Sequence, residues 1–265
     1  NKFDITIVTT ETSDYVWRQK FEKHAEVFDL TSFLHRQDWP AFIHYIMKSR
    51  NIDIVMQSNS YFGFYVIPWL KSEFPEVVFT DYLHSENRSW RNGEYPRDST
   101  AIDGFLDRTY TCTKVLRESM KNNMGRTIDN VKTVYIGVDE EEFDRNKVEV
   151  TNNKDLEKQL EKIKGKKAIL FLCRISEEKR PIFMVEVFKK LVKKDKQLVL
   201  LVVGDGPQLN EMKEKVRNES ISDKVIFFGM QSNVKPFYKV SDVSVICSLV
   251  EGLTITTYES LAMGT

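Results

Sequence analysis

Short apolar runs alternate with longer amphipathic stretches along most of this 265-residue chain. In the second half, the strand-length apolar runs lie at residues 168–173, 198–203, 225–228 and 243–247. Helical periodicity fills the intervals between them, at about residues 181–194, 207–218 and 233–240. Because this alternation is typical of a parallel sheet covered by crossover helices, we expect the second half to be a doubly wound α/β unit.

The first half shows the same alternation less regularly. Its expected strands lie at residues 4–9, 26–30, 52–57, 77–82, 108–112 and 131–136. Between Asp139 and Lys167 the apolar content falls and charged residues accumulate, and a charged helix is expected at Asp155–Lys164. This change of composition predicts an N-terminal domain at 1–145, a charged linker at 146–166 and a C-terminal domain at 167–265.

Composition narrows the class of protein. Lys plus Arg and Asp plus Glu each number 39, so there is no overall positive charge that would attract nucleic acid. No apolar run approaches the roughly 20 residues that are needed to span a bilayer. The cysteines form no Cys-x-x-Cys pair and lie within apolar runs, which favours ordinary buried thiols at Cys112, Cys173 and Cys247. We therefore expect a cytoplasmic protein without nucleic-acid partners.

Two carboxylates, Glu251 and Glu259, stand on either side of a predicted turn. The turn follows the apolar run at 243–247, contains Gly252 and leads into a helix expected at Thr254–Met263. The start of a helix offers unpaired N–H groups and the positive end of the helix dipole, which together attract phosphate. An anion site at this turn is therefore predicted. Glu251 as a surface or capping residue, and Glu259 as a first-turn acid that complements the dipole, are the ordinary alternatives.

Two further turns follow strands at the same edge of the predicted sheet, where open α/β sheets bind their ligands. The first contains Arg174 and Lys179, and both side chains could bind a diphosphate. Arginine would do so through its planar, two-pronged guanidinium group and lysine as a point charge. The second is Gly204-Asp205-Gly206-Pro207, in which the glycines allow close backbone approach and Pro207 suits the start of a helix. A solvated surface turn and a plain strand-to-helix turn are the respective alternatives.

In the first half, His84 directly follows an expected strand and opens a polar segment. A site residue at the carboxyl end of a strand and a packing or capping histidine are both open interpretations. The segment also contains candidates for an acceptor site, with packing an equal alternative: Arg88, Trp90 and Arg91. The other histidines have no partner at metal-ligand spacing and are expected to be structural: His24, His35 and His44.

Together these residues resemble family 4 of the retaining, nucleotide-sugar-dependent glycosyltransferases. In the second half, the resemblance rests on Arg174 to Lys179, Gly204 to Pro207, Val225 to Gly229, and the Glu251 and Glu259 pair with the residues up to Thr265. In the first half, it rests on Tyr82-Leu83-His84 and on Tyr135-Ile136-Gly137-Val138-Asp139 with Phe143. The resemblance implies the GT-B fold, with two facing Rossmann-like domains and mostly parallel sheets. Both domains are expected to be incomplete, because nothing like the family's first strand and Gly-rich loop precedes Ile5 and a last strand is expected beyond Thr265.

The resemblance also implies a role for each site residue. Arg174 and Lys179 would neutralise the donor diphosphate, Glu251 would face the transferred sugar, and His84 would bond a sugar hydroxyl. For Glu251, a nucleophile and an electrostatic stabiliser are both open, and we favour the second. Glu259 would accept hydrogen bonds from the ribose. The remaining donor-binding residues expected are Gly252, Leu253, Thr254, Gly204, Gly206 and Met230, with the amides of Leu253 and Thr254 on a phosphate.

The implied activity is transfer of a sugar from a nucleoside-diphosphate sugar to a sugar or lipid-linked hydroxyl, in cell-surface polysaccharide or glycolipid synthesis. No metal or other cofactor is expected, since no Asp-x-Asp occurs and cationic side chains with helix amides would replace the metal. A lipid-linked acceptor leaves open a peripheral association with the inner face of the membrane. Two alternatives stay open: a sugar-nucleotide epimerase of the same fold, and a non-catalytic nucleotide-sugar-binding or partner subunit. Incomplete domains also leave open that the chain is inactive by itself.

Overall fold

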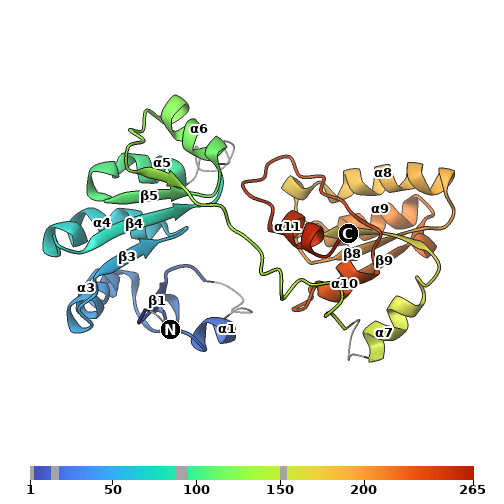
Figure 1. Cartoon of the computed structure of the whole chain (residues 1–265), viewed down its shortest axis with the longest axis horizontal. Helices are drawn as coiled ribbons and strands as arrows, with labels where there is room; N and C mark the ends of the chain where they lie inside the picture. Colours follow the sequence, from blue (N-terminus) through green and yellow to red (C-terminus); the bar gives the residue numbers. More distant parts are fainter. Residues whose placement is uncertain (1–2, 13–17, 87–94, 150–153) are drawn as a thin grey trace. The chain divides into compact units, whose positions relative to one another are not determined.

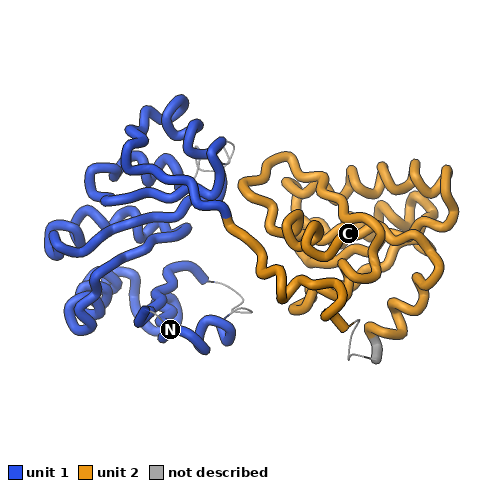
Figure 2. Tube along the Cα trace, in the orientation of Figure 1, with its two compact units in different colours: residues 1–135 blue, residues 136–265 orange. Residues whose placement is uncertain are grey.

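The computed structural model describes residues 3–12, 18–86, 95–149 and 154–265. The chain divides into two compact units, residues 1–135 and 136–265, which are drawn in different colours in Figure 2. Each unit contains parallel strands with helices between them. In the part of the chain that is described, no helix is both long enough and apolar enough to cross a lipid bilayer.

The second unit is built on a four-stranded parallel sheet in the order β10-β7-β8-β9. Its strands are β7 (Lys167–Leu172), β8 (Leu198–Val203), β9 (Val225–Gly229) and β10 (Val243–Ser244). The first three confirm the predicted strands. The fourth is shorter than the predicted 243–247, because β10 lies at the edge of the sheet and leaves it after Val245 donates its N–H to Leu170 O at 2.9 Å.

Helices cover both faces of this sheet. The helices of the unit are α7 (Lys154–Glu161), α8 (Pro181–Lys194), α9 (Leu209–Asn218), α10 (Lys235–Val240) and α11 (Ile255–Ala262), with short 3-10 helices η3 (Glu177–Lys179) and η4 (Ser222–Lys224). Successive strand residues point to opposite faces, so Ile169 and Phe171 pack with α8 and α9, whereas Leu170 packs with α10. Figure 1 shows these helices around the strands of the second unit. This double cover confirms the doubly wound arrangement that the sequence predicts.

The first unit contains two parallel sheets among its described residues. One is the pair β1 (Thr6–Thr9) and β2 (Glu26–Asp29), and the other has the order β3-β4-β5-β6. The strands of the larger sheet are β3 (Ile54–Gln57), β4 (Val78–Leu83), β5 (Arg108–Thr111) and β6 (Val131–Thr133). Although β1 does not pair with β3, Val8 and Phe28 pack against the same apolar cluster as Phe79 of β4, so both sheets share one core.

Helices connect the strands of the first unit. They are α1 (Arg18–Glu22), α2 (Leu30–Phe33), α3 (Trp39–Ser49), α4 (Tyr61–Glu73), α5 (Tyr95–Ala101) and α6 (Lys114–Met124), with 3-10 helices η1 (Arg36–Asp38) and η2 (Asp103–Phe105). Ser60 caps α4 and Thr113 caps α6 through side-chain bonds to Gly63 N and Leu116 N. Both caps come within three residues of the end of a strand, β3 and β5, so each helix begins shortly after its strand ends.

The segment 136–149 belongs to the second unit. The Arg145 guanidinium group donates hydrogen bonds to the carbonyl oxygens of Lys239 at 2.8 Å and of Met263 at 3.2 Å, at the ends of α10 and α11. Val148 lies in the core of the same unit. The units therefore divide at residue 135, whereas the drop in apolar content suggested 145, because a charged segment can still pack through one arginine and one valine.

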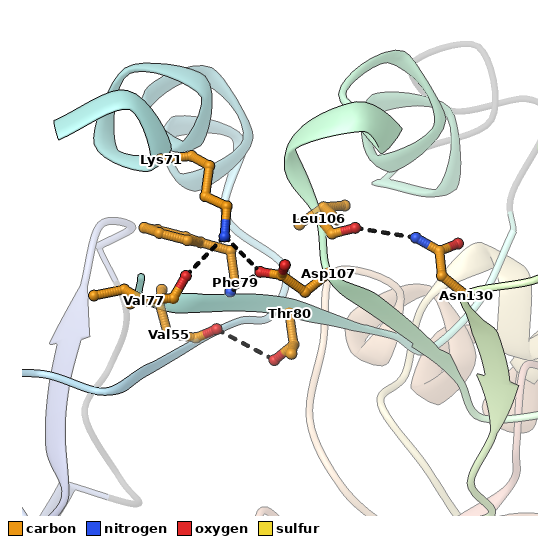
Figure 3. Close-up of polar contacts among 8 residues, drawn as sticks. All are labelled: Val55, Lys71, Val77, Phe79, Thr80, Leu106, Asp107 and Asn130. Carbon is orange, nitrogen blue, oxygen red and sulfur yellow. Dashed lines mark hydrogen bonds and ion pairs between the residues drawn. The ribbon is translucent and has the colours of Figure 1, made fainter. Parts of the chain in front are cut away.

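A charged contact links α4 to two strands at the amino edge of the larger sheet (Figure 3). Lys71 Nζ lies 2.9 Å from both Asp107 Oδ2 and Val77 O, and the N–H of Phe79 donates to Asp107 Oδ2 at 2.7 Å. Burial raises the pKa of Asp107, but the bonds from Lys71 and Phe79 outweigh burial and hold the pKa below its ordinary value. Asp107 thus joins the start of β5 to β4 and α4.

We expect Asp107→Asn to lower the free energy of unfolding at neutral pH by about 1 kcal/mol. This is less than a fully buried charged hydrogen bond contributes, because the Asp107 side chain is 42% exposed and solvent screens its charge. A depressed pKa means that the stabilisation is present above the ordinary pKa and is lost as the pH falls through the folded-state value. The difference between the two proteins should therefore disappear in strong acid. Urea unfolding across the pH range measures it, with the exposed Asp129→Asn as control. An equal stability at neutral pH would contradict this role of Asp107.

Candidate functional site

Four loops of the second unit meet at the carboxyl edge of its sheet. They follow β7, β8, β9 and β10, and the parallel pairing places all of them at one edge. Backbone hydrogen bonds join neighbouring loops: Ile175 N–H to Asp205 O at 2.9 Å, and Leu249 N–H to Glu178 O at 2.8 Å. The loops that the sequence selects as candidate binding segments therefore form one connected surface.

The glycines of the β8 loop allow it to lie directly on the β7 loop. Gly204 has φ +130°, and a Cβ atom there would stand 1.9 Å from Cys173 O. At Gly206, with φ +158°, a Cβ atom would stand 2.5 Å from Ile175 O. The close approach predicted for these glycines is thus made to the backbone of the turn that carries Arg174. Pro207 does not start the helix, because the Gln208 N–H is held by Ile175 O at 2.9 Å and α9 begins only at Leu209.

Lys179 and Glu251 form an ion pair at this edge. Lys179 Nζ lies 2.6 Å from Glu251 Oε1, and the two side chains are only 22% and 26% exposed. Lys179 ends η3, and the next residue, Arg180, has the left-handed φ of 55° and precedes α8. Such a backbone conformation costs a non-glycine residue of order 1 kcal/mol and is typical of functional turns. The exposed side chain of Arg174 supplies a second cation in the same turn.

Glu259 lies deeper, as the fifth residue of α11. It is half-buried, and the hydroxyl group of Tyr238 donates a hydrogen bond to its Oε2 at 2.8 Å. Burial raises the pKa of Glu259, the bond from Tyr238 opposes the rise, and the negative charge of Glu142 adds to it. The first turn of α11 contains no acid, so the alternative in which Glu259 complements the helix dipole is wrong.

The start of α11 and the loop before it carry the backbone part of the predicted site. The helix begins at Ile255 with Thr254 as its N-cap, one residue after the predicted start, and no side chain caps it. Gly252, Leu253 and Thr254 are all partly exposed. An uncapped helix start with accessible preceding residues is the arrangement that can present N–H groups to an anion.

Met230 follows β9 at the same edge and is 58% exposed. With this exposure Met230 is not a core residue. Beside it, Gln231 Nε2 donates to Phe228 O at 2.7 Å, which fixes the turn after β9. Gly204 N–H donates to Gly229 O at 2.8 Å, so the turn that carries Met230 is joined to the β8 loop.

His84 lies in the first unit, directly after β4 and at the carboxyl edge of its own sheet. Its Nε2 lies 3.0 Å from Ser58 Oγ, its ring contacts Tyr82 at 4.8 Å between centroids, and its carbonyl oxygen accepts a bond from Cys112 Sγ at 2.7 Å. Burial lowers the pKa of His84, so the imidazole is neutral at pH 7. Arg88, Trp90 and Arg91 lie outside the described residues.

His44 and the three cysteines show no reactive arrangement where the structure describes them. His44 stacks on Trp69 at 5.6 Å, which confirms its structural role. Burial raises the pKa of Cys173 to about 12 and also raises the pKa values of Cys112 and Cys247, so these thiols stay protonated. Among the described residues, no group of three or more His, Cys, Asp or Glu side chains is arranged to hold a metal ion.

Comparison with known proteins adds to this geometry. Residues 152–265, the part that contains the Lys179 and Glu251 pair, match the family model of glycosyl transferases group 1. Alpha-monoglucosyldiacylglycerol synthase of Streptococcus pneumoniae is 36% identical over 136 residues, which is 51% of this chain and 31% of that protein. Residues 152–265 are therefore similar to the group 1 glycosyltransferases. Another relative, N-acetyl-alpha-D-glucosaminyl L-malate synthase of Bacillus anthracis, is 28% identical over 51% of this chain and 34% of its own length.

Solved structures confirm the GT-B fold over nearly the whole chain. A glycosyltransferase from Rickettsia africae has a TM-score of 0.75 and 20% identity, covering 99% of this chain and 69% of that one. Anabaena Alr3699/HepE in complex with UDP has a TM-score of 0.76 and 14% identity, covering 98% of this chain and 71% of that one. The alignment with the two curated relatives spans only about a third of their length.

The sequence predicted most of the residues on the surface that these loops form, but it did not predict two residues, Tyr238 and Arg145, that hold α11 in place. Tyr238 falls in the apolar run Pro236-Phe237-Tyr238, which carries the signal of a core segment only. Arg145 falls in a charged stretch that the composition assigns to a domain boundary. Both act on α11 from parts of the chain distant in sequence, and no local pattern identifies such contacts.

Proposed function

We propose that this chain is part of a group 1 glycosyltransferase that moves a sugar from a nucleoside-diphosphate sugar to a hydroxyl acceptor, with retention of the anomeric configuration and without a metal ion or other cofactor. The observation that carries the proposal is the 2.6 Å contact between Lys179 Nζ and Glu251 Oε1. This contact places the Lys179 cation, which can bind a diphosphate, beside the Glu251 carboxylate. A carboxylate can stabilise the positive charge that develops on the anomeric carbon of the sugar. Arg174 in the same turn adds a planar donor for the phosphates.

In the proposed reaction, the bond between the anomeric carbon and the diphosphate oxygen breaks, and the nucleotide leaves with the electron pair. Lys179 and Arg174 stabilise the negative charge that forms on the departing phosphate. The N–H groups of Leu253 and Thr254 at the start of α11 hold that phosphate. Glu251 stabilises the positive charge that develops on the sugar ring. The oxygen of the acceptor hydroxyl forms the new bond to the anomeric carbon on the same face, and its proton passes to the departing phosphate.

The other site residues are proposed to hold and select the donor. Glu259 accepts hydrogen bonds from the ribose, and Met230 contacts the base at the turn after β9. Gly204 and Gly206 contribute by holding the Arg174 turn in place against their own loop. His84, neutral and in the first unit, is proposed to bond a sugar hydroxyl, which it can serve as donor or acceptor.

Named relatives support a uridine nucleotide and a lipid or lipid-linked acceptor. Anabaena Alr3699/HepE was solved in complex with UDP-glucose, and the pneumococcal O-GlcNAc transferase GtfA with UDP and GlcNAc. Alpha-monoglucosyldiacylglycerol synthase is named for a diacylglycerol product, and a transferase of Campylobacter jejuni for a diphosphoundecaprenol-type acceptor. We accordingly propose that the enzyme acts in polysaccharide or glycolipid synthesis, in the cytoplasm at the inner face of the membrane.

A transfer assay tests this proposal. The protein is incubated in EDTA with radiolabelled UDP-, GDP- or ADP-sugars and with sugar, diacylglycerol and polyprenyl-diphosphate acceptors. We expect one pair to give nucleoside diphosphate and an α-linked product from an α-linked donor, as NMR of the new bond reports, and Glu251→Gln to abolish the product. An inverted product, or an isomeric donor formed without acceptor, would contradict the proposal, and the second result would indicate an epimerase.

The pH dependence of donor binding provides another prediction. Glu259 must be ionised to accept hydrogen bonds from both ribose hydroxyls. Burial raises the pKa of Glu259, and the hydrogen bond from Tyr238 opposes part of this rise. Nucleoside-diphosphate affinity should therefore be complete above this raised pKa and fall as the pH drops through it, starting above the ordinary range of a glutamate. Calorimetry at a series of pH values measures the change. Glu259→Gln serves as the control for titration of the phosphates, and an identical profile in both proteins would exclude Glu259.

A further inference from the structure

Tyr238 lies buried behind the carboxylate of Glu259 in the second unit. Its side chain has no exposed surface, and it belongs to the apolar cluster on the α10 face of the sheet. Its hydroxyl group donates to Glu259 Oε2 at 2.8 Å and also lies 3.3 Å from the carbonyl oxygen of Thr256. Both acceptors are in α11, so a single hydroxyl group joins α10 to the helix that carries the proposed ribose ligand.

We propose that Tyr238 is a positioning residue for the donor: it holds the Glu259 carboxylate in the orientation that accepts hydrogen bonds from the ribose and thereby favours ribonucleotides over deoxyribonucleotides. The inference rests on the proposed function, because it takes Glu259 as the residue that binds the ribose. Tyr238 itself need not touch the ligand, since it is enclosed by the core.

Rigid support of this kind matters because a glutamate side chain loses rotamer freedom when it is ordered by a ligand. Tyr238 removes part of that cost in advance, since its ring is fixed by packing and its carbonyl oxygen accepts a bond from Thr265 Oγ1 at 2.9 Å. Burial and the adjacent carboxylate raise the pKa of Tyr238, so its hydroxyl is protonated and can donate at neutral pH. Oε1 of Glu259 and one lone pair of Oε2 remain for the ribose.

The charged surroundings of Glu259 are set by three groups on two segments. Tyr238 of α10 favours the ionised carboxylate by its hydrogen bond, whereas Glu142 disfavours it by its negative charge. Lys235, also of α10, pairs with Glu142 at 3.0 Å. Loss of the Tyr238 hydroxyl therefore removes the interaction that favours ionisation and should raise the pKa of Glu259 further.

Tyr238→Phe removes only this hydroxyl and provides the test. Calorimetry first measures the affinities of the wild-type protein for UDP, GDP and ADP. The nucleotide that binds most tightly is then compared with its 2′-deoxy counterpart in the wild type and the variant. We expect the preference for the ribonucleotide to fall about fivefold in Tyr238→Phe, the effect of one lost hydrogen bond, with little change in deoxyribonucleotide affinity. In a Glu259→Ala background, Tyr238→Phe should have no further effect on the preference.

Two more measurements distinguish positioning from general loosening of the unit. Ser241→Ala removes another buried hydroxyl, bonded to Phe237 O at 2.7 Å in the same region, and should keep the full preference. The pKa of the Glu259 carboxyl, followed by carbon NMR without any ligand, should be higher in Tyr238→Phe than in the wild type.

Each opposite result has a distinct meaning. An unchanged preference in Tyr238→Phe, or an equal loss for both nucleotides, overturns the positioning role and leaves the proposed function standing. A full ribose preference in Glu259→Ala overturns the ribose assignment and the inference with it. If none of the three diphosphates binds to the wild-type protein, the proposed function fails first, and the inference is overturned together with it.

Discussion

Substitution of Gly204 by alanine should destabilise the second unit by about 2–4 kcal/mol, or prevent its folding. The new Cβ atom would stand 1.9 Å from Cys173 O and 3.0 Å from the Cys173 carbonyl carbon, and both are backbone atoms that continue the central strand β7. Overpacking a rigid contact typically costs 1–3 kcal/mol, and the φ of +130° adds strain of order 1 kcal/mol for any residue with a side chain. Since whole domains are stable by roughly 5–15 kcal/mol, this is a large fraction of the total.

Gly165→Ala is the matched control. Gly165 lies in the same unit with φ +76°, but a Cβ atom there has no heavy atom within 4 Å. This variant carries the backbone strain without the collision, and we expect a loss of about 1 kcal/mol. Urea unfolding followed by circular dichroism measures both variants. If Gly204→Ala lost no more stability than Gly165→Ala, the contact between the β8 and β7 loops would not be the reason for glycine at 204.

Lys179→Ala should weaken nucleoside-diphosphate binding by about 1.5–3 kcal/mol, which is roughly ten- to a hundredfold or more. The variant removes a partly buried cation that a diphosphate would contact, and it also leaves Glu251 without its partner at 2.6 Å. Because an unpaired carboxylate near the phosphate adds repulsion, the loss in Lys179→Ala should exceed the loss in the double variant Lys179→Ala/Glu251→Gln. Calorimetry with the same nucleotide measures each of the three proteins.

Lys167→Ala provides the control for this prediction. Lys167 begins β7 and forms a similarly short ion pair with Asp195 at 2.7 Å, but it stands at the amino end of the strand whose carboxyl end leads to Lys179. Its removal should leave nucleotide affinity unchanged. An equal loss of affinity in both variants would indicate that lysine removal acts through general stability, and no loss in Lys179→Ala would remove this residue from the proposed site.

The strands and the location of the site follow from simple physical rules. Apolar runs of strand length predicted β7, β8 and β9 nearly to the residue, because residues buried on both faces of a parallel sheet leave a continuous apolar signal. Since parallel strands end at one edge, Lys179 and Glu251 could be expected near each other although 72 positions separate them. The resemblance then assigned them chemistry.

Other features depend on contacts that leave no local signal. The pair Tyr238 and Glu259 joins two helices, and a tyrosine within an apolar run predicts only burial. The close packing at Gly204 could not be distinguished from close approach to a ligand, since both require the same missing side chain. The fall in apolar content suggested that the first domain ends at 145, whereas the first unit ends at 135. The reason is that Arg145 binds the carbonyl oxygens at the ends of α10 and α11 and so belongs to the second unit. Tertiary packing decides each of these cases.

Binding of a nucleoside diphosphate in EDTA tests the central claim most directly, since the four loops at the carboxyl edge of the second unit are proposed to replace a metal with Lys179, Arg174 and the start of α11. The measurement is a calorimetric titration of the protein with UDP, GDP and ADP, with and without added magnesium. We predict saturable one-to-one binding of one of them in EDTA, unchanged by magnesium and lost or greatly weakened in Lys179→Ala. Binding that requires the metal, or that Lys179→Ala leaves intact, would contradict the account.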